Sequence, residues 1–163
     1  MIRAHQKAAG AGKEGRTPEA SAAAQALGRS RGGHGTKGHV LADAGGRAIG
    51  FVLTPGQAAE LPQAEGLLGF LPGTPMWTVA DRGYSSHALR AAIWDLGSIP
   101  AIPTRKNEAP VACRPWIYAN RERVERLWSR LKEWRAVATR YDKTARSFLG
   151  VLSLAATFYW IRR

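Results

Sequence analysis

Residues 76–103 read MWTVADRGYSSHALRAAIWDLGSIPAIP, and the order of elements within this stretch decides the expected fold. The apolar run over 76–80 predicts a short strand that ends directly on Asp81. A turn follows, and a serine cap then begins a helix that a glycine ends. A final short strand over 99–103 contains two prolines, which favour a position at a sheet edge or a strand end. Strand, helix and strand in succession predict a domain of the α/β class.

The sequence on either side supplies the rest of the predicted domain. Residues 39–54, HVLADAGGRAIGFVLT, predict a hairpin, because two apolar runs flank a glycine-rich turn. Helices are expected over 58–68, over 115–134 and over 144–161. We therefore expect helices that flank a mixed sheet.

Residues 1–36 differ in composition from the rest of the chain. They are rich in Ala, Gly, Lys and Arg and show little periodicity, which predicts a basic, poorly packed leader. The folded domain is then expected over 37–163.

The charge balance limits the class of partner. The 163 residues carry 24 Lys and Arg against 12 Asp and Glu, a net charge of +12. This favours nucleic acid over the alternatives, which are an anionic membrane surface and an incidentally basic protein. The single cysteine, Cys113, excludes a disulfide framework and a Cys-based metal site. The longest apolar run, 148–161, is shorter than the ~20 residues of a membrane span, and no signal peptide is visible, so we expect a cytoplasmic protein without a membrane partner.

The predicted helix over 115–134 concentrates polar chemistry on one face. Four of its side chains fall within roughly 60° of one another around the helix axis. They are Tyr118, Arg121, Glu125 and Lys132. The apolar stripe of this helix lies roughly 130° away. It consists of Val124, Leu127, Leu131 and Trp134. A carboxylate among a phenol, a guanidinium and an ammonium suits a protein that acts on phosphodiesters, although an Arg–Glu pair at this spacing is also an ordinary helix contact.

A second acidic residue joins Glu125 in the candidate chemistry. Asp81 follows a strand, and ligand sites of open α/β sheets gather at such strand ends, although an aspartate here can also simply start a turn. Two carboxylates from different elements of a basic protein suit a Mg²⁺ or Mn²⁺ site, because hard cations prefer oxygen ligands. Two such ions about 4 Å apart would clamp an in-line phosphoryl displacement.

The same helix carries candidates for DNA contacts. A second basic stripe suits the binding of backbone phosphates. It consists of Arg123, Arg126 and Arg130. Trp128 lies between the apolar stripe and Glu125 and is the best candidate for an aromatic side chain near DNA, with a place in the core as the alternative.

A glycine-rich basic segment over 31–39 is a further candidate phosphate contact. Arg31 and Lys37 supply its charge, and its glycines would let the backbone approach a phosphate, but it lacks the spacing of a P-loop. His34 and His39 in this segment would lack the further ligands that a zinc site needs.

Several ordered blocks of the chain resemble bacterial insertion-sequence transposases of the DDE class. The spacing Tyr-x2-Arg-x3-Glu-x6-Lys matches the YREK signature of that class, and the other blocks resemble the family-five branch. These blocks are Ser30–Gly33, Thr36–Lys37 with His39, Leu53–Gln57, Ala80–Tyr84 and Arg140–Arg146. The resemblance runs from about Arg3 to Arg163, and it implies an RNase H-like fold with metal-binding carboxylates at the edge of the sheet.

The resemblance also implies roles for the residues singled out above. Asp81 and Glu125 would be the second and third acids of the catalytic triad and would hold Mg²⁺ or Mn²⁺. Arg121 and Lys132 would contact phosphate near the scissile position, and Tyr118 would position the backbone. The implied activity is DNA transposition, in which water cleaves DNA at the element's ends and the freed 3′-hydroxyl attacks target DNA. The implied partner is double-stranded DNA, bound by a homo-oligomer associated with the bacterial nucleoid.

The resemblance places the first acid of the triad upstream of Met1. The family carries an Asp-Ser-Thr block shortly before an Arg-Ala-His-Gln segment, and Arg3–Gln6 here is preceded by two residues only. Asp43 is no substitute, because it occupies the predicted hairpin turn. We therefore expect a missing or incomplete first catalytic strand, as in the second reading frame of a frameshift fusion or in a decayed fragment. The alternatives are a catalytically inactive DNA-binding regulator and a metal-dependent nuclease that does not join strands.

Overall fold

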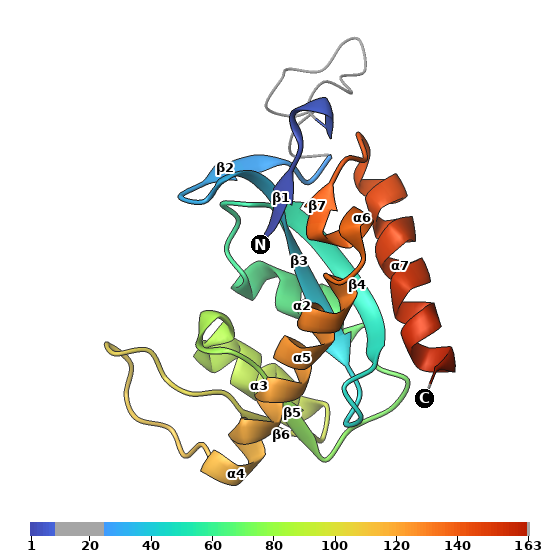
Figure 1. The fold of residues 1–163 in the computed structure, drawn as a ribbon. Coiled ribbons are helices and arrows are strands. Elements are labelled where there is room, and N and C mark those ends of the chain that lie inside the picture. Colours follow the sequence, from blue (N-terminus) through green and yellow to red (C-terminus); the bar gives the residue numbers. More distant parts are fainter. Residues whose placement is uncertain (9–24, 163) are drawn as a thin grey trace.

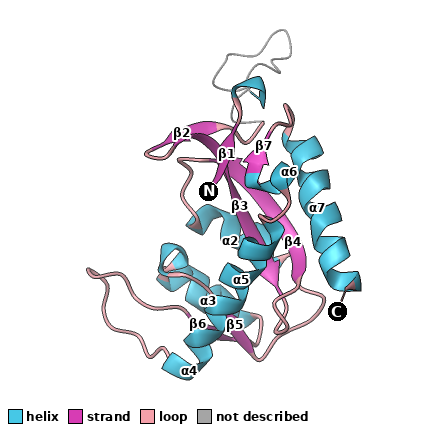
Figure 2. Cartoon of the chain, viewed as in Figure 1, coloured by secondary structure: helices cyan, strands magenta, loops and turns pink. Residues whose placement is uncertain are grey.

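The computed structural model describes residues 1–8 and 25–162 (Figure 1). Its strands form one five-stranded sheet and one separate two-stranded sheet, with helices around them (Figure 2). The mixed α/β class predicted from the sequence is confirmed, and the arrangement is consistent with an RNase H-like domain. Within the described residues, no helix is long and apolar enough to cross a membrane.

The five-stranded sheet is built around β3 (Gly33–Ala42). β4 (Ala48–Pro55) pairs with it antiparallel and completes the predicted hairpin. β2 (Gly28–Ser30) pairs with the first residues of β3. β1 (Ile2–Ala4) lies antiparallel to β3 and parallel to β7 (Thr139–Arg140), so segments far apart in the sequence meet in one sheet.

The two-stranded sheet is the strand–helix–strand unit predicted from residues 76–103. β5 (Trp77–Val79) and β6 (Ile99–Ala101) pair in parallel, and α3 (His87–Asp95) connects them. The Ser86 hydroxyl caps this helix by accepting a 3.0 Å hydrogen bond from the backbone N–H of Leu89. Such a cap satisfies one of the N–H groups that the first helical turn leaves without a partner.

The predicted helix over 115–134 is divided in the structure. It consists of α4 (Pro115–Tyr118), a 3₁₀ turn over Ala119–Arg121, and α5 (Glu122–Leu131). The 3₁₀ turn changes the angular step between residues. The side chains of α4 therefore do not keep the angular relation to α5 that a continuous helix would give.

The predicted helix also ends earlier than expected, at Leu131. Trp134 adopts extended backbone (ψ 115°) and precedes the short α6 (Arg135–Ala138). Its ring stacks on Phe158 at a centroid distance of 5.4 Å, and the residue is 41% exposed. The prediction that Trp134 belongs to the buried stripe is therefore wrong.

The main core lies between the five-stranded sheet and the helices α5 and α7 (Ala145–Ile161). Its buried members are Ile2, Ala48, Phe51, Leu127, Leu131, Val137, Phe148, Leu152, Ala155 and Ala156. A smaller core joins α3 to α2 (Ala64–Leu68), which follows a 3₁₀ turn over Leu61–Gln63. It consists of Ala64, Leu89, Ile93 and Ile102.

The prediction that residues 1–36 form a poorly packed leader is wrong for their described part. Ile2 is 2% exposed and belongs to the main core, and Thr36 is fully buried within β3. A domain boundary after residue 36 would cut β3 in two. Residues 2–4 form β1, and residues 9–24 lie outside the described part of the chain.

Candidate active site

Asp81 lies two residues after the end of β5, where the chain turns into a short 3₁₀ helix over Arg82–Tyr84. Its backbone carbonyl accepts a 2.9 Å hydrogen bond from the N–H of Tyr84. Its side chain is 55% exposed. The carboxylate therefore stands at the carboxyl end of a parallel strand, which is the usual place of ligand sites in α/β sheets.

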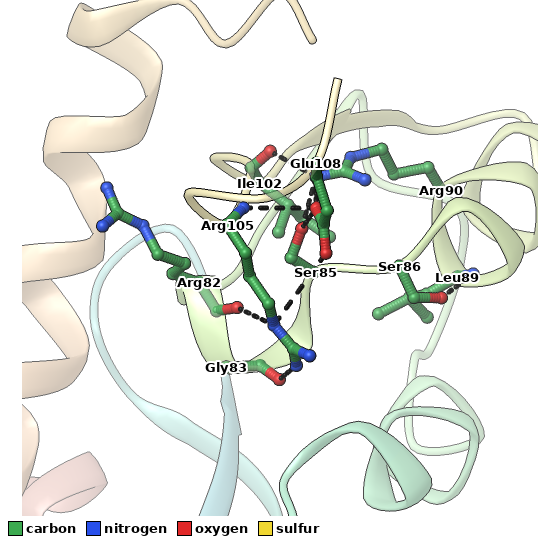
Figure 3. A network of polar contacts seen from close by, with 9 residues as sticks. All are labelled: Arg82, Gly83, Ser85, Ser86, Leu89, Arg90, Ile102, Arg105 and Glu108. Carbon is green, nitrogen blue, oxygen red and sulfur yellow. Dashed lines mark hydrogen bonds and ion pairs between the residues drawn. The ribbon is translucent and has the colours of Figure 1, made fainter. Parts of the chain in front are cut away.

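The loop after β6 holds this turn from outside (Figure 3). Arg105 donates from Nη2 to the carbonyl of Gly83 at 2.9 Å and from Nε to the carbonyl of Arg82 at 3.5 Å. Glu108 accepts hydrogen bonds from the hydroxyl of Ser85 and, at 3.2 Å, from the backbone N–H of Arg105. The hydrogen bond from Ser85 is the largest cause that lowers the pKa of the Glu108 carboxyl. A charged Glu108 thus keeps the loop fastened to the turn.

Arg90 supports the same turn from inside the smaller core. Its Nη2 donates to the hydroxyl of Ser85 at 2.7 Å and to the carbonyl of Ile102 at 3.2 Å, and it lies 3.8 Å from the Glu108 carboxylate. Arg90 is only 6% exposed. The backbone that carries Asp81 is therefore anchored both in the core and in the following loop.

A histidine of β3 forms a third support. The ring of His39 is hydrogen-bonded to the hydroxyl of Tyr84 through Nδ1 at 2.7 Å and to the hydroxyl of Thr54 through Nε2 at 2.9 Å. Burial, followed by the charge of Lys37, lowers the pKa of His39, and burial raises the pKa of Tyr84. Both groups are therefore neutral at pH 7 and link the two sheets without charge. His39 serves this link, and no zinc ligand set forms around it in the described residues.

Arg121 joins the two candidate metal ligands. Its Nη1 lies 2.6 Å from Oε1 of Glu125 and 3.2 Å from Oδ1 of Asp81, so a single nitrogen contacts both carboxylates. Its guanidinium also lies 5.6 Å from the ring centroid of Tyr118. Partial burial lowers the pKa of Arg121, but the charges of Asp81, Tyr118 and Glu125 outweigh this effect and raise it overall. The structure thus brings together four of the five residues predicted to be catalytic.

The fifth, Lys132, lies at the end of α5 beside a cavity of about 430 Å³. Glu125 lines the same cavity and also accepts the hydrogen bond from Arg121, so it connects the cavity with the pair of carboxylates. The other lining residues are Met1, Ile2, Gly38, Trp128 and Ser129. The cavity opens between the start of the chain, β3 and α5.

Asp81 and Glu125 fit a divalent metal in part. Their oxygens converge on one nitrogen, and carboxylate oxygens suit hard cations such as Mg²⁺. Among the described residues, no third His, Cys, Asp or Glu completes a cluster with them. Asp43 accepts hydrogen bonds of 2.8 Å from the backbone and the side chain of Arg47 in the hairpin turn, which is consistent with its exclusion as a ligand.

The predicted DNA-binding residues on α5 make local contacts. Arg123 donates to Asn120 at 3.2 Å, and Arg126 donates to Glu122 at 2.5 Å and 3.0 Å. Arg130 is hydrogen-bonded to the hydroxyl of Tyr159. All three arginines remain exposed.

The other three predicted DNA-binding residues lie apart from this stripe. Trp128 is partly buried, and its ring contacts Phe51 edge-on at a centroid distance of 6.0 Å. Lys37 donates to Glu60 at 3.2 Å, whereas Arg31 is exposed in the turn between β2 and β3. The six predicted DNA-binding residues therefore come from three parts of the described chain, namely α5, β3 and the turn before β3.

Sequence reasoning did not find the residues that fasten the turn after Asp81. Ser85 and Glu108 are 23 residues apart, and His39 and Tyr84 are 45 residues apart. No short motif links such residues, so only the fold shows that they meet.

Comparison with known proteins identifies the family. A family model described as "Transposase DDE domain" matches residues 2–112, and a second model with the same description matches residues 78–162. The chain is 34% identical over 131 residues to a putative transposase for insertion sequence element IS6501 from Brucella ovis, covering 78% of this chain and 98% of that protein.

A more distant relative is the putative transposase for insertion sequence element IS402 from Burkholderia cepacia. It is 28% identical over 123 residues, which cover 68% of this chain and 56% of that protein. No solved structure matches the chain. The matches across both halves of the sequence show that the chain belongs to the DDE-domain transposases of bacterial insertion sequences.

Proposed function

We propose that this chain carries the catalytic core of a transposase of the family-five branch with a YREK signature. The proposed reaction is metal-dependent cleavage at the ends of the element followed by strand transfer into target DNA. The observation that carries the proposal is the approach of Asp81 and Glu125 to one nitrogen of Arg121, although the two acids come from different elements.

Each residue of the site has a proposed task. Asp81 and Glu125 would hold Mg²⁺ or Mn²⁺, which supplies charge stabilisation at the reacting phosphate when bound. Arg121 and Lys132 would contact phosphate oxygens near the scissile bond, and Tyr118 would fix the backbone beside Arg121. Phosphoryl transfer depends mainly on such positioning and charge stabilisation.

The DNA backbone would extend from the site across α5. The exposed arginines of this helix suit phosphate contacts, and each contact would steepen the salt dependence of binding. They are Arg123, Arg126 and Arg130. Arg31 and Lys37 would make further contacts beside β3, and Trp128 would border the DNA from the cavity side. We propose that a homo-oligomer performs the reaction on the bacterial nucleoid.

We propose that a segment N-terminal to Met1 supplies the first acid. Ile2 pairs with Thr36 and Arg3 with Gly35. Because the strands are antiparallel, each residue toward the N-terminus of β1 lies opposite the next residue toward the C-terminus of β3. The residue before Met1 would therefore lie opposite Gly38, which lines the 430 Å³ cavity together with Glu125. A strand that continued β1 in this direction, as in a fusion with an upstream reading frame, would deliver an aspartate to the cavity that Glu125 lines.

The test compares two glutamates of α5. In a protein that includes the upstream aspartate, Glu125→Gln should abolish Mg²⁺-dependent cleavage of element-end DNA and leave DNA binding intact. Glu122→Gln is the matched control, because Glu122 is exposed on the same helix and pairs with Arg126. Persistent cleavage in Glu125→Gln would contradict the assignment of the third acid.

The second candidate function is a DNA-binding regulator that competes for the element's ends. Among the described residues, Asp81 and Glu125 have no third acid beside them, which favours this function for the chain. This function predicts binding without cleavage for the present chain, and no gain of cleavage when the upstream segment is added. A metal-dependent nuclease would gain cleavage on that addition but would yield no joined products.

A further inference from the structure

We infer that Arg121 and a divalent ion compete for the same two carboxylates, so that binding of the ion releases Arg121 for a DNA phosphate. The inference rests on the proposed function, which places the ion between Asp81 and Glu125. Metal binding and DNA binding would thereby be coupled through one side chain.

The two ion pairs of Arg121 make the competition direct. Nη1 of Arg121 lies 2.6 Å from Oε1 of Glu125 and 3.2 Å from Oδ1 of Asp81. A Mg²⁺ ion binds carboxylate oxygens at about 2.0–2.1 Å. An ion held by both carboxylates would need the oxygens that Nη1 of Arg121 now contacts, so it would have to displace the guanidinium. The like charges of the ion and the guanidinium would also repel each other.

The ion pairs of Arg121 with Asp81 and Glu125 are weak enough for a metal ion to displace the guanidinium. The side chains of Arg121, Asp81 and Glu125 are 35%, 55% and 58% exposed. Ion pairs at such exposure contribute little, because water screens the charges and the side chains lose conformational freedom. Loss of the pairs should therefore change metal affinity by a modest factor, about two- to fivefold.

The released side chain is suited to a phosphate. A guanidinium presents a planar fork of donors that matches two phosphate oxygens, and the Tyr118 ring 5.6 Å away limits where it can turn. Coupling of this kind is reciprocal. If the ion frees Arg121 for DNA, the ion must raise DNA affinity by the same factor by which DNA raises metal affinity.

The first arm of the test measures Mn²⁺ binding to the chain by electron paramagnetic resonance, with the double variant Asp81→Asn, Glu125→Gln as baseline. Arg121→Gln should bind Mn²⁺ about two- to fivefold more tightly than the wild type. Arg123→Gln is the matched control: it removes the same charge two residues further along the chain, but Arg123 contacts Asn120 instead of the acids. Equal or weaker binding in Arg121→Gln, or an equal gain in Arg123→Gln, would overturn the inference.

The second arm measures affinity for duplex DNA with and without Mn²⁺. The ion should tighten binding by the wild type and by Arg123→Gln, and this gain should be absent in Arg121→Gln. The double variant Asp81→Asn, Glu125→Gln distinguishes a failure of the proposed metal site from a failure of the inference. Mn²⁺ binding that does not depend on Asp81 and Glu125 in any variant contradicts the proposed metal site and the inference with it. Dependent binding that is unaltered in Arg121→Gln contradicts the inference alone.

Discussion

Arg140 donates a 2.6 Å hydrogen bond from Nη1 to the hydroxyl of Thr36, and both residues are fully buried. The contact joins β7 to β3 across 104 residues of sequence. Thr36 in turn donates to the carbonyl of Ala26 at 2.7 Å, and Arg140 donates to the carbonyls of Gln25 at 2.9 Å and Asp142 at 2.9 Å. Burial lowers the pKa of Arg140, so these oxygens must compensate for its lost hydration.

Arg140→Lys should lower the free energy of unfolding by about 2–4 kcal/mol. Lysine carries its donors on one nitrogen and cannot reach the separate oxygens that Nε and Nη1 contact around the edge of the guanidinium. Chemical denaturation measures the effect. Arg126→Lys is the control, because Arg126 has a 68% exposed side chain and should tolerate the change. Equal stability of the two variants would show that the buried network contributes little.

Ile2→Ala should lower the free energy of unfolding by about 2–5 kcal/mol, as for other buried isoleucines. Ile2 is 2% exposed and packs in the main core, although it is the second residue of the chain. His34→Ala tests the same N-terminal region at an exposed position and should be nearly neutral. A disordered leader would make both substitutions neutral in thermal unfolding.

The N-terminal strand could not be predicted from the sequence, whereas other elements could. The hairpin and the strand–helix–strand unit are predictable because their periodicity and caps are local. β1 has only three residues, and its pairing partners in β3 and β7 lie 32 to 34 and 136 residues away, so no local signal marks it. The same limit applies to the site: the motif predicts Glu125, but the contact between Arg121 and Asp81 depends on how two sheets are joined.

Gly38→Ala should destabilise the protein by about 1–3 kcal/mol through overpacking. A Cβ at this position would lie 2.7 Å from Cη2 of Trp128, and the Trp128 ring is confined by Phe51. Gly150→Ala is the control, because no atom lies within 4 Å of its added Cβ and alanine favours the interior of α7. Thermal unfolding should separate the two variants in opposite directions. A neutral Gly38→Ala would mean that Trp128 moves freely and could turn toward DNA.

Glu108→Gln should loosen the loop that fastens the turn after Asp81. The amide keeps the shape of the side chain but removes the charge that strengthens the hydrogen bonds from Ser85 and Arg105. Trypsin should then cleave after Lys106 faster than in the wild type at pH 8. Glu65→Gln, at an exposed position on α2, should leave the cleavage rate unchanged. An unchanged rate in Glu108→Gln would place the anchor of this loop elsewhere.

The stability of the protein should rise with pH through the range in which an ordinary histidine loses its proton. Burial lowers the pKa of His39, so the folded protein keeps the ring neutral at pH values where the unfolded chain, with a pKa of about 6.5, binds a proton. Stability is therefore lost as pH falls below about 6.5 toward the folded pKa, by at most about 1.4 kcal/mol per pH unit. Urea unfolding between pH 5 and pH 8 measures this slope.

His39→Gln separates His39 from the other titrating groups. Glutamine can still form hydrogen bonds with Tyr84 and Thr54 but does not titrate, so the slope between pH 5 and pH 8 should flatten. His34→Gln, at an exposed position on the same strand, should keep the wild-type slope. The hydrogen bond between His39 and Tyr84 does not set the pH dependence of folding if His39→Gln keeps the wild-type slope of unfolding free energy against pH and His34→Gln loses it.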